Sequence, residues 1–428
     1  MKSVSDIYQE RLNNLLKPFI NSNHVNPTIN LQNMKLLMKY LNNPDKSFHQ
    51  IHVAGTSGKT STCYYLASLI SQNNIRVGLC VSPYVDIVSE RFQVNFQRLN
   101  IEEVYKLFKK YLVILSKFNK DLSYFDLIYS FSIWYFAAQN VDYGVIETGI
   151  GGKFDPTNIL DSKTKICVIT DIGYDHQEIL GNTISEIAYQ KVGIVKKNNT
   201  LITYSKSPTV MKVFKDWTKK VNAKIKVLDS DYNNLALKNN KTFNSIAEYQ
   251  QKNFNLAFFT YNYLESRDGL KHLNKIDLDK SIKVNIPGRM EEVILDDKSL
   301  LVLDGAHNQQ KIQTFLNSFN RKYPNQLPAV LIAISQKKDY QKILDELINI
   351  NAFLIVTKFK TQQSMPIKSI NVKNLKAHLI NRGYHNYLIS SNLDNAVKLL
   401  LSQKNRTKIV TGSFYLVSQV KKKLNLFS

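Results

Sequence analysis

Residues 52–62, HVAGTSGKTST, place two glycines around a Gly-Lys-Thr sequence, directly behind a short apolar run. Gly55 and Gly58 would let backbone N–H groups close around phosphate oxygens, and Lys59 would reach the β- and γ-phosphates of a nucleotide. Val53 stands where the first glycine of the usual GxxxxGK[ST] spacing belongs. An ordinary tight turn would explain the glycines but not the Gly-Lys-Thr order, so the segment predicts a phosphate-binding loop.

Three polar residues follow other predicted strands, at the edge of the sheet where the metal of a bound nucleotide would lie. Ser82 ends the run IRVGLCVS, Glu147 ends YGVIE, and His176 comes just after KICVITDIG. One carboxylate, one hydroxyl and an occasional histidine suffice for Mg²⁺, which keeps waters and substrate phosphates in its shell. Taken singly, these residues could instead be a turn former, a solvated strand end and a packed loop residue. Their convergence on one sheet edge favours a metal site.

Lys191 is expected at the same edge. Thr183 and Glu186 have the spacing of a capping box, which predicts a helix that begins there and carries Lys191 back toward the sheet. A lysine beside a divalent cation has the wrong sign of charge unless it is modified or held away. The alternative interpretation is a solvated cation at a helix end, which the helix dipole favours.

The elements that must position these residues alternate between strand and helix. After an amphipathic helical start, an apolar i, i+3, i+4, i+7 pattern follows Lys59, and nearly all-apolar strands come after it. Such alternation is typical of right-handed βαβ units and a parallel sheet, whose ligands bind beyond the carboxyl ends of the strands. The fold class is therefore α/β, with a parallel-sheet P-loop ATPase domain.

A second strand–helix alternation begins near the segment IPGRMEEV at 286–293. The strands LLVLDGA, AVLIAIS and AFLIVTKF are separated by helical stretches, which predicts a smaller Rossmann-like α/β domain. We place the two domains at residues 1–286, with an N-terminal helical segment, and 287–428.

The composition narrows the class of protein. A net charge of +23 would draw nucleic acid or acidic substrates, but the lysines are spread along the chain without a nucleic-acid-binding motif. The three cysteines, Cys63, Cys80 and Cys167, lie in apolar segments and are expected to be buried thiols, as in the reducing cytoplasm. No signal peptide or membrane span is expected. We expect a cytoplasmic monomer that binds neither nucleic acid nor membrane.

Several segments together resemble the Mur ligase superfamily of ATP-dependent amide ligases, and within it the folylpolyglutamate synthase/dihydrofolate synthase family. The resemblance runs from about residue 50 to residue 418. Thr60 stands where the folate branch usually has glycine, and Gln309 replaces the proline usual after DGAHN. The segments that carry it are HVAGTSGKTS, SPY…ER, IETGIGGKFDPTN, IGYDHQEILGNTISEIAYQKVGIVK, YQQKN, PGRMEE, LVLDGAHN and IVTGSFYLV.

The resemblance implies roles for matching positions. Lys59, Lys191 and His176 would be catalytic, with Lys191 carbamylated by CO₂, which would turn the amine into an anion. Ser82, Glu147 and His176 would hold Mg²⁺, and His307 with Ser413 would bind the amino-acid substrate. ATP would contact Gly55, Thr56, Ser57, Gly58, Lys59, Thr60, Ser61, Asn253, Arg289 and Asp304. The domains would be an ATP-binding central domain and a C-terminal glutamate-ligase domain.

The implied function is an ATP-dependent ligase that joins L-glutamate to a folate or dihydropteroate carboxylate through an acyl phosphate. The partners would be the small-molecule substrates ATP, L-glutamate, and folate or dihydropteroate, and the sequence leaves open which acceptor is used. A ligase for a cell-wall precursor or another amino-acid polymer is the nearest rival. A nucleotide-controlled switch protein without ligase chemistry is an alternative of a different class.

Overall fold

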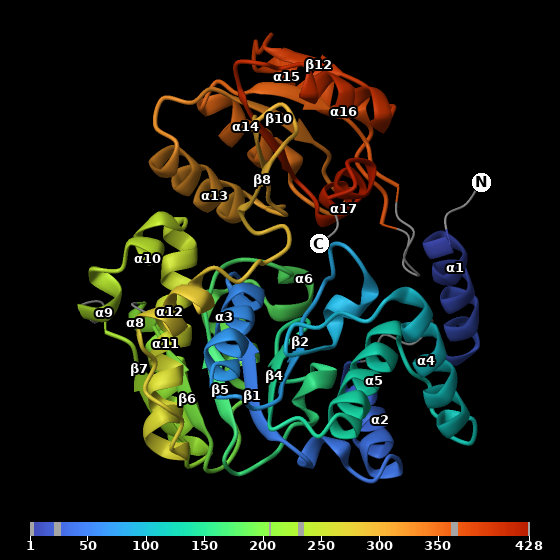
Figure 1. Cartoon of the computed structure of the whole chain (residues 1–428), viewed down its shortest axis with the longest axis vertical. Helices are drawn as coiled ribbons and strands as arrows, with labels where there is room; N and C mark the ends of the chain where they lie inside the picture. The colour runs from blue at the N-terminus through green and yellow to red at the C-terminus, as the bar shows by residue number, and fades with distance from the viewer. Residues whose placement is uncertain (1–3, 21–26, 205–206, 230–234, 361–366, 427–428) are drawn as a thin grey trace. The chain divides into compact units, whose positions relative to one another are not determined.

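The computed structural model describes residues 4–20, 27–204, 207–229, 235–360 and 367–426, and its elements are labelled as in Figure 1. The chain forms two compact units. The first unit comprises residues 1–244 and 250–284, and the second comprises residues 245–249 and 285–428. The short segment 245–249 therefore belongs to the second unit although it precedes the last part of the first.

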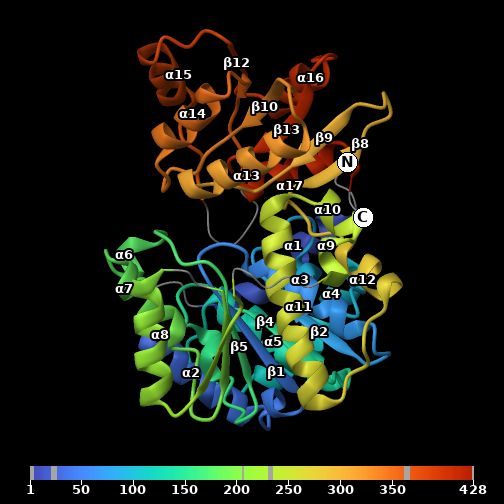
Figure 2. The same cartoon turned by 90° about the vertical axis from the view of Figure 1, so that its left-hand side faces the viewer.

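The first unit is built on a seven-stranded sheet of order β3-β2-β4-β1-β5-β6-β7, in which only β3 runs antiparallel to its neighbour. Its central strands are buried along almost their whole length, as expected of a parallel sheet covered on both faces. In Figures 1 and 2, β1 lies in the middle of this unit. The strands are β1 His49–Ala54, β2 Val77–Cys80, β3 Gln93–Val94, β4 Tyr143–Glu147, β5 Ile166–Ile169, β6 Thr200–Thr203 and β7 Lys224–Val227.

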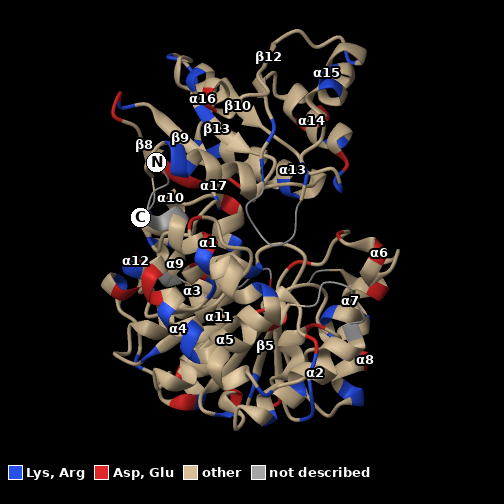
Figure 3. Cartoon of the chain, turned by 90° about the vertical axis from the view of Figure 1, so that its right-hand side faces the viewer, with Lys and Arg blue, Asp and Glu red and all other residues tan. Residues whose placement is uncertain are grey.

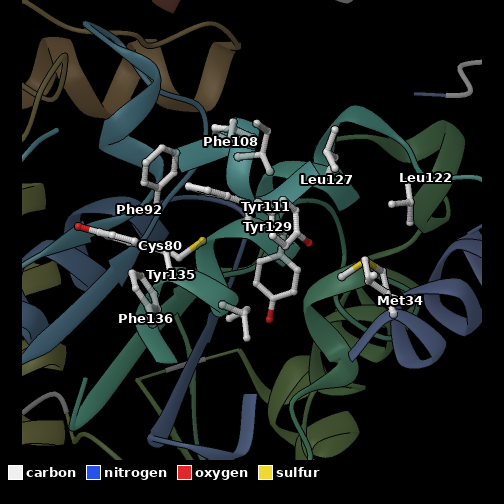
Figure 4. Close-up of a cluster of buried hydrophobic side chains, with 14 of the residues drawn as sticks. Met34, Cys80, Phe92, Phe108, Tyr111, Leu122, Leu127, Tyr129, Tyr135 and Phe136 are labelled. Atoms are coloured by element: carbon white, nitrogen blue, oxygen red, sulfur yellow. The ribbon is translucent and has the colours of Figure 1, made fainter. Parts of the chain in front are cut away.

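Helices pack on this sheet through two apolar clusters. An aromatic-rich cluster, shown in Figure 4, includes Phe108 and Phe131, whose rings stack 3.8 Å apart. The second cluster joins β5 and β6 to α7 and α8. Helices of the unit or of its boundary are α1 Val4–Leu16, α2 Pro27–Tyr40, α3 Lys59–Ser71, α4 Ile101–Leu115, α5 Tyr124–Ala138, α6 Gln177–Leu180, α7 Ile184–Val192, α8 Pro208–Lys220, α9 Leu235–Lys238, α10 Lys241–Ser245, α11 Glu248–Asp268 and α12 Lys275–Ile282.

The second unit holds a six-stranded sheet of order β12-β11-β10-β13-β9-β8, in which only β8 is antiparallel. Its apolar strands pack against helices through one further cluster of buried side chains. Its elements are β8 Glu291–Ile294, β9 Leu300–Leu303, β10 Pro328–Ile332, β11 Phe353–Val356, β12 Tyr387–Ile389, β13 Thr407–Thr411, α13 Gln309–Lys322, α14 Tyr340–Asn349, α15 Val372–Asn381, α16 Leu393–Leu401 and α17 Phe414–Lys423.

The predicted α/β class is confirmed, with each sheet mostly parallel and one antiparallel edge strand in each. Cys63, Cys80 and Cys167 are buried free thiols, as predicted. None of the helices in the described part of the chain is long and apolar enough to cross a membrane. Figure 3 shows Lys and Arg side by side with Asp and Glu over both units.

Candidate active site

The predicted phosphate loop connects β1 to α3, and two of its glycines are sterically required. Gly55 has a φ of 153°, and a Cβ atom there would lie 1.8 Å from Thr170 Oγ1. Gly58, the N-cap of α3, has a φ of 84°, and a Cβ there would lie 2.3 Å from Asn253 Oδ1. The loop therefore packs against the end of β5 and against α11, with no room for larger residues.

Residues that follow β5 brace this loop. Thr56 donates its N–H to Asp171 O over 2.7 Å and its hydroxyl to Gly173 O over 3.0 Å. Thr170 Oγ1 donates to Ser57 O over 2.6 Å. These contacts fix Thr56 and Ser57 at the N-terminal end of α3, where helix N–H groups and the helix dipole favour an anion. Ser61 is buried in the first turn of the same helix.

Two lysines converge on one carbonyl oxygen of the loop. Lys59 Nζ donates to Gly55 O over 3.1 Å, and Lys191 Nζ donates to the same atom over 2.9 Å. The predicted capping box is present, because Thr183 Oγ1 accepts from Glu186 N and Glu186 Oε2 accepts from Thr183 N. Helix α7 thus delivers Lys191 into the protein, where only 4% of its surface is exposed. The interpretation of Lys191 as a solvated helix-end cation is wrong.

Glu147 joins two other predicted residues. It lies opposite Val53 in the β1/β4 pairing and is 3% exposed, so it is not a solvated strand end. Its carboxylate accepts a hydrogen bond from Thr60 Oγ1, 3.0 and 3.1 Å from the two oxygens, and one from Ser82 N over 3.0 Å. A buried carboxylate bonded to one hydroxyl, with Ser82 supplying another, is the hard-oxygen donor set that Mg²⁺ prefers. These residues fit the ion.

His176 lies near acidic residues that are close to it in the sequence. Its backbone has a φ of 51°, and it precedes α6 directly. Its ring nitrogens lie 3.9 Å from Asp175 Oδ1 and 3.7 Å from Glu178 Oε1. Across the described ranges, no three or more His, Cys, Asp or Glu side chains gather as a metal cluster. A site with Glu147 as its one carboxylate is consistent with that finding, and the roles of His176 stay predictions.

A hydrogen-bonded network that the sequence did not reveal holds the loop after Glu147. Asp155 accepts hydrogen bonds from Ile150 N over 2.8 Å and from Thr157 N and Oγ1 over 3.0 and 2.5 Å. Thr157 Oγ1 also lies 2.8 Å from Nε2 of the fully buried His52. Burial, followed by the nearby Lys165, lowers the pKa of His52 well below its usual value. A neutral imidazole thus braces the strand end that carries Glu147.

Buried amide and amine groups tie this loop to the segment that follows Lys191. Asn158 Nδ2 donates to Gly193 O over 3.1 Å, and Lys196 Nζ donates to Asn158 O over 2.6 Å. Burial, and then the charge of Lys165, lowers the pKa of Lys196 to about 7. These hydrogen bonds link the loop that follows Glu147 to the segment that follows Lys191.

In the second unit, Asp304 follows β9 and is 4% exposed. Its Oδ1 accepts from Ala306 N, and its Oδ2 accepts from Met290 N and from Tyr249 Oη, each over 2.8 Å. Burial raises the pKa of Asp304, while Arg289 and these hydrogen bonds oppose the rise. The carboxylate thus holds together the ends of β9, the turn before β8 and the segment 245–249.

Three more predicted residues gather around Phe414, at the start of α17. The Arg289 guanidinium lies 4.0 Å from the centre of its ring, and the His307 ring lies 5.6 Å from it. His307 Nδ1 lies 2.7 Å from Gly305 O, so this nitrogen carries the proton, and Nε2 lies 3.2 Å from Lys311 Nζ. Ser413 caps α17 by accepting from Tyr415 N.

The sequence matches two family models that follow one another along the chain. Residues 53–291 match the Mur ligase middle domain, and residues 289–426 match the C-terminal domain of dihydrofolate synthetase. The chain belongs to the folylpolyglutamate synthase/dihydrofolate synthase family. The first model contains the phosphate loop, Glu147 and Lys191, and the second contains Asp304, His307 and Ser413.

Full-length relatives agree with this family. The chain is 28% identical over 419 residues to the dihydrofolate synthase/folylpolyglutamate synthase of Bacillus subtilis, covering 92% of this chain and 94% of that relative. It is 27% identical to the dihydrofolate synthetase of Saccharomyces cerevisiae, covering 92% and 97%. The Mycobacterium tuberculosis folylpolyglutamate synthase complexed with ADP has the same fold, with a TM-score of 0.82, 22% identity and coverage of 98% and 99%. The predicted family is confirmed.

Proposed function

We propose that this chain acts as a dihydrofolate synthase/folylpolyglutamate synthase, an ATP-dependent ligase that adds L-glutamate to a dihydropteroate or folate carboxylate. The observation that carries the proposal is the meeting of Lys59 and Lys191 on Gly55 O, beside the Glu147–Thr60 pair. One relative named for both activities and another named dihydrofolate synthetase each match 92% of the chain. A structure of similar fold, Escherichia coli FolC in complex with DHPP and ADP, supports small-molecule substrates.

In the first half of the reaction, a carboxylate oxygen of the acceptor attacks the γ-phosphorus of ATP. The bond to the β–γ bridging oxygen breaks, ADP leaves, and an acyl phosphate forms. Lys59 and the N–H groups at the start of α3 hold the phosphates and stabilise the charge that shifts toward ADP. Glu147, Thr60 and Ser82 would hold Mg²⁺ through oxygen atoms and His176 through a nitrogen, and the ion would supply further charge neutralisation.

In the second half, the amine of glutamate attacks the acyl carbon, loses a proton and expels phosphate. The acyl phosphate is hydrolysable, so the residues that orient the amine must also keep water away. We assign Arg289 and Asp304 to the nucleotide, together with Asn253, and His307 and Ser413 to glutamate. The support for the glutamate assignment is that His307 lies against Phe414, the residue after Ser413, so an imidazole and a hydroxyl for an amino-acid ligand come from neighbouring positions.

Lys191 is assigned a carbamate. Two ammonium groups on one carbonyl oxygen repel each other, and the uncharged amine of Lys191 reacts with CO₂ to give an anion and a proton. The carbamate oxygens would be attracted to Lys59 and would add oxygen donors for Mg²⁺. The proposal also includes a monomer in the cytoplasm, in keeping with the three free, buried thiols.

The test is a substrate panel with product masses. The chain is incubated with MgATP, L-glutamate and either dihydropteroate, tetrahydrofolate or a muramyl precursor. We expect an amide product with the first or second acceptor, one phosphate per amide, and none with the third. Lys59→Ala should abolish the product, whereas Lys109→Ala, an exposed lysine on α4, should not. Phosphate release without any amide, or ligation of the muramyl acceptor alone, would overturn the proposal.

A further inference from the structure

Arg91 is a buried cation close to the candidate active site. It ends the short helix Val88–Arg91, and only 8% of its surface is exposed. Its guanidinium carbon lies 5.3 Å from the centre of the Tyr84 ring and 5.7 Å from that of Tyr124. The next residue, Phe92, is 1% exposed and packs in the aromatic cluster of Figure 4. Arg91 is therefore anchored, with its guanidinium within 6 Å of the centres of two aromatic rings.

The acidic groups of the same loop are already engaged elsewhere. Asp86 pairs with Arg98 over 3.2 Å. The Glu90 carboxylate accepts the backbone N–H groups of residues 85–87, over 2.6 to 3.1 Å. In the part of the chain that the structure describes, Arg91 makes no ion pair, and its Nε is buried without a hydrogen-bond partner. The loop thus leaves a guanidinium uncompensated.

Aromatic rings alone do not satisfy such a group. A guanidinium carries five N–H donors in a planar fork, and cation–π contacts stabilise its charge without accepting those hydrogens in the usual way. A buried charge without hydrogen bonds is costly. The fork matches a carboxylate in two parallel hydrogen bonds, which is the strongest arrangement for either partner. The site therefore suits an anionic, planar oxygen ligand.

The order of the strands indicates which anionic substrate Arg91 would meet. Neighbouring strands of the sheet end, in turn, at the phosphate loop after β1, at Glu147 after β4 and at Ser82 after β2. Arg91 lies in the loop that leaves β2, on the side of Glu147 away from the phosphate loop. An acceptor bound on that side would present its carboxylate, across Glu147, to the phosphates that the loop would hold.

We propose that Arg91, which lies beside Tyr84 and Tyr124, binds the reacting carboxylate of the acceptor and aims it at the γ-phosphate. The two rings would also contact the aromatic ring that bears this carboxylate in dihydropteroate. This inference rests on the proposed function, and it assigns Arg91 a direct contact with substrate. Arg98, paired with Asp86 in the same loop, has no such role and provides a matched control.

The test compares the binding of dihydropteroate with that of its carboxamide, which lacks the charge. Dissociation constants are measured for wild type, Arg91→Met, Arg91→Lys and Arg98→Met. Wild type should bind the acid 10- to 100-fold more tightly than the amide, as expected for about 1.5 to 3 kcal/mol from charged hydrogen bonds. Arg91→Met should bring the ratio near one, and Arg98→Met should leave it unchanged. Arg91→Lys, which keeps a charge but loses the fork, should give an intermediate ratio.

The Michaelis constants for the acceptor, ATP and glutamate show which of these anionic substrates Arg91 binds. The Michaelis constant for the acceptor should rise at least tenfold in Arg91→Lys, while those for ATP and glutamate should change less than twofold. A larger change for ATP or for glutamate would overturn the assignment, and so would an acid-to-amide ratio that Arg91→Met leaves intact. If wild type bound neither compound but ligated glutamate to tetrahydrofolate, this inference alone would fail. If it also ligated neither dihydropteroate nor tetrahydrofolate, the proposed function would fail with it. Arg91→Lys supplies the answer should Arg91→Met not fold.

Discussion

Replacing Lys191 by methionine should stabilise the protein when CO₂ is absent. In the structure both Lys191 Nζ and Lys59 Nζ donate to Gly55 O, over 2.9 and 3.1 Å. Two ammonium groups within about 6 Å of each other repel by about 3 kcal/mol at an effective dielectric constant of about 20. The lost hydrogen bond offsets about 1 kcal/mol of this. We therefore expect Lys191→Met to raise the free energy of unfolding of the first unit by about 2 kcal/mol.

The assay uses the two tryptophans of the chain, Trp134 and Trp217, which both lie in the first unit. Their fluorescence follows the unfolding of this unit in urea, without a signal from the second. Measurements are made in CO₂-depleted buffer and again with bicarbonate and Mg²⁺. Wild type should gain stability with bicarbonate, because the carbamate replaces repulsion by attraction. Lys191→Met should not respond.

Lys215→Met, at an exposed position on α8, serves as the control and should respond to bicarbonate as wild type does. The reasoning would be refuted if Lys191→Met were less stable than wild type in CO₂-depleted buffer. It would also be refuted if bicarbonate stabilised both proteins equally.

Three further outcomes are expected. Glu147→Gln should raise the Mg²⁺ concentration for half-maximal ligation at least tenfold, because a buried anionic ligand is lost. Asp216→Asn, at an exposed position on α8, should not raise it. Equal Mg²⁺ titrations would remove Glu147 from the site. Lys196, with its pKa lowered to about 7 from 10.5, binds more protons when unfolded between those pH values, so wild type gains stability as pH rises through this window. Lys196→Met should therefore be more stable than wild type, and the difference should be largest near pH 7. In urea titrations this difference in the free energy of unfolding should shrink by up to about 1.4 kcal/mol per pH unit toward pH 10. A difference that does not depend on pH would contradict this. Lys421→Met should lower the free energy of unfolding by about 3 to 5 kcal/mol in calorimetry, because it leaves Glu291, its buried partner at 2.7 Å, without its counter-charge. Adding Glu291→Gln should recover part of this loss. If the effects of the two substitutions simply add, the pair is not coupled.

Local patterns predicted the elements that carry the chemistry. The Gly-Lys-Thr order, the apolar strand before Glu147 and the capping box at Thr183 depend on neighbours within a few residues, and all three appear as expected. Convergence at the sheet edge followed from the rule that parallel strands end on one side. The predicted fold class required no more than this, whereas the family was predicted from the resemblance of longer segments to known ligases.

The features of the site that the sequence did not predict depend on contacts between segments that are distant along the chain. Lys191 is buried because α7 packs on the end of β1, whereas a lysine in the last turn of a helix is typical of a solvated position. The network of Asp155, Thr157 and His52 joins residues more than 100 positions apart. Arg91 occurs in a stretch that mixes polar and apolar residues, and no periodicity there indicates a guanidinium beside two aromatic rings.

The central claim is that the acceptor carboxylate attacks ATP and forms an acyl phosphate before glutamate is joined. The most direct test uses dihydropteroate or tetrahydrofolate with ¹⁸O in its reacting carboxylate, together with MgATP and glutamate, and measures the mass of the released phosphate. The account predicts one ¹⁸O atom transferred to phosphate for each amide formed. Phosphate without ¹⁸O, while amide product accumulates, would contradict it.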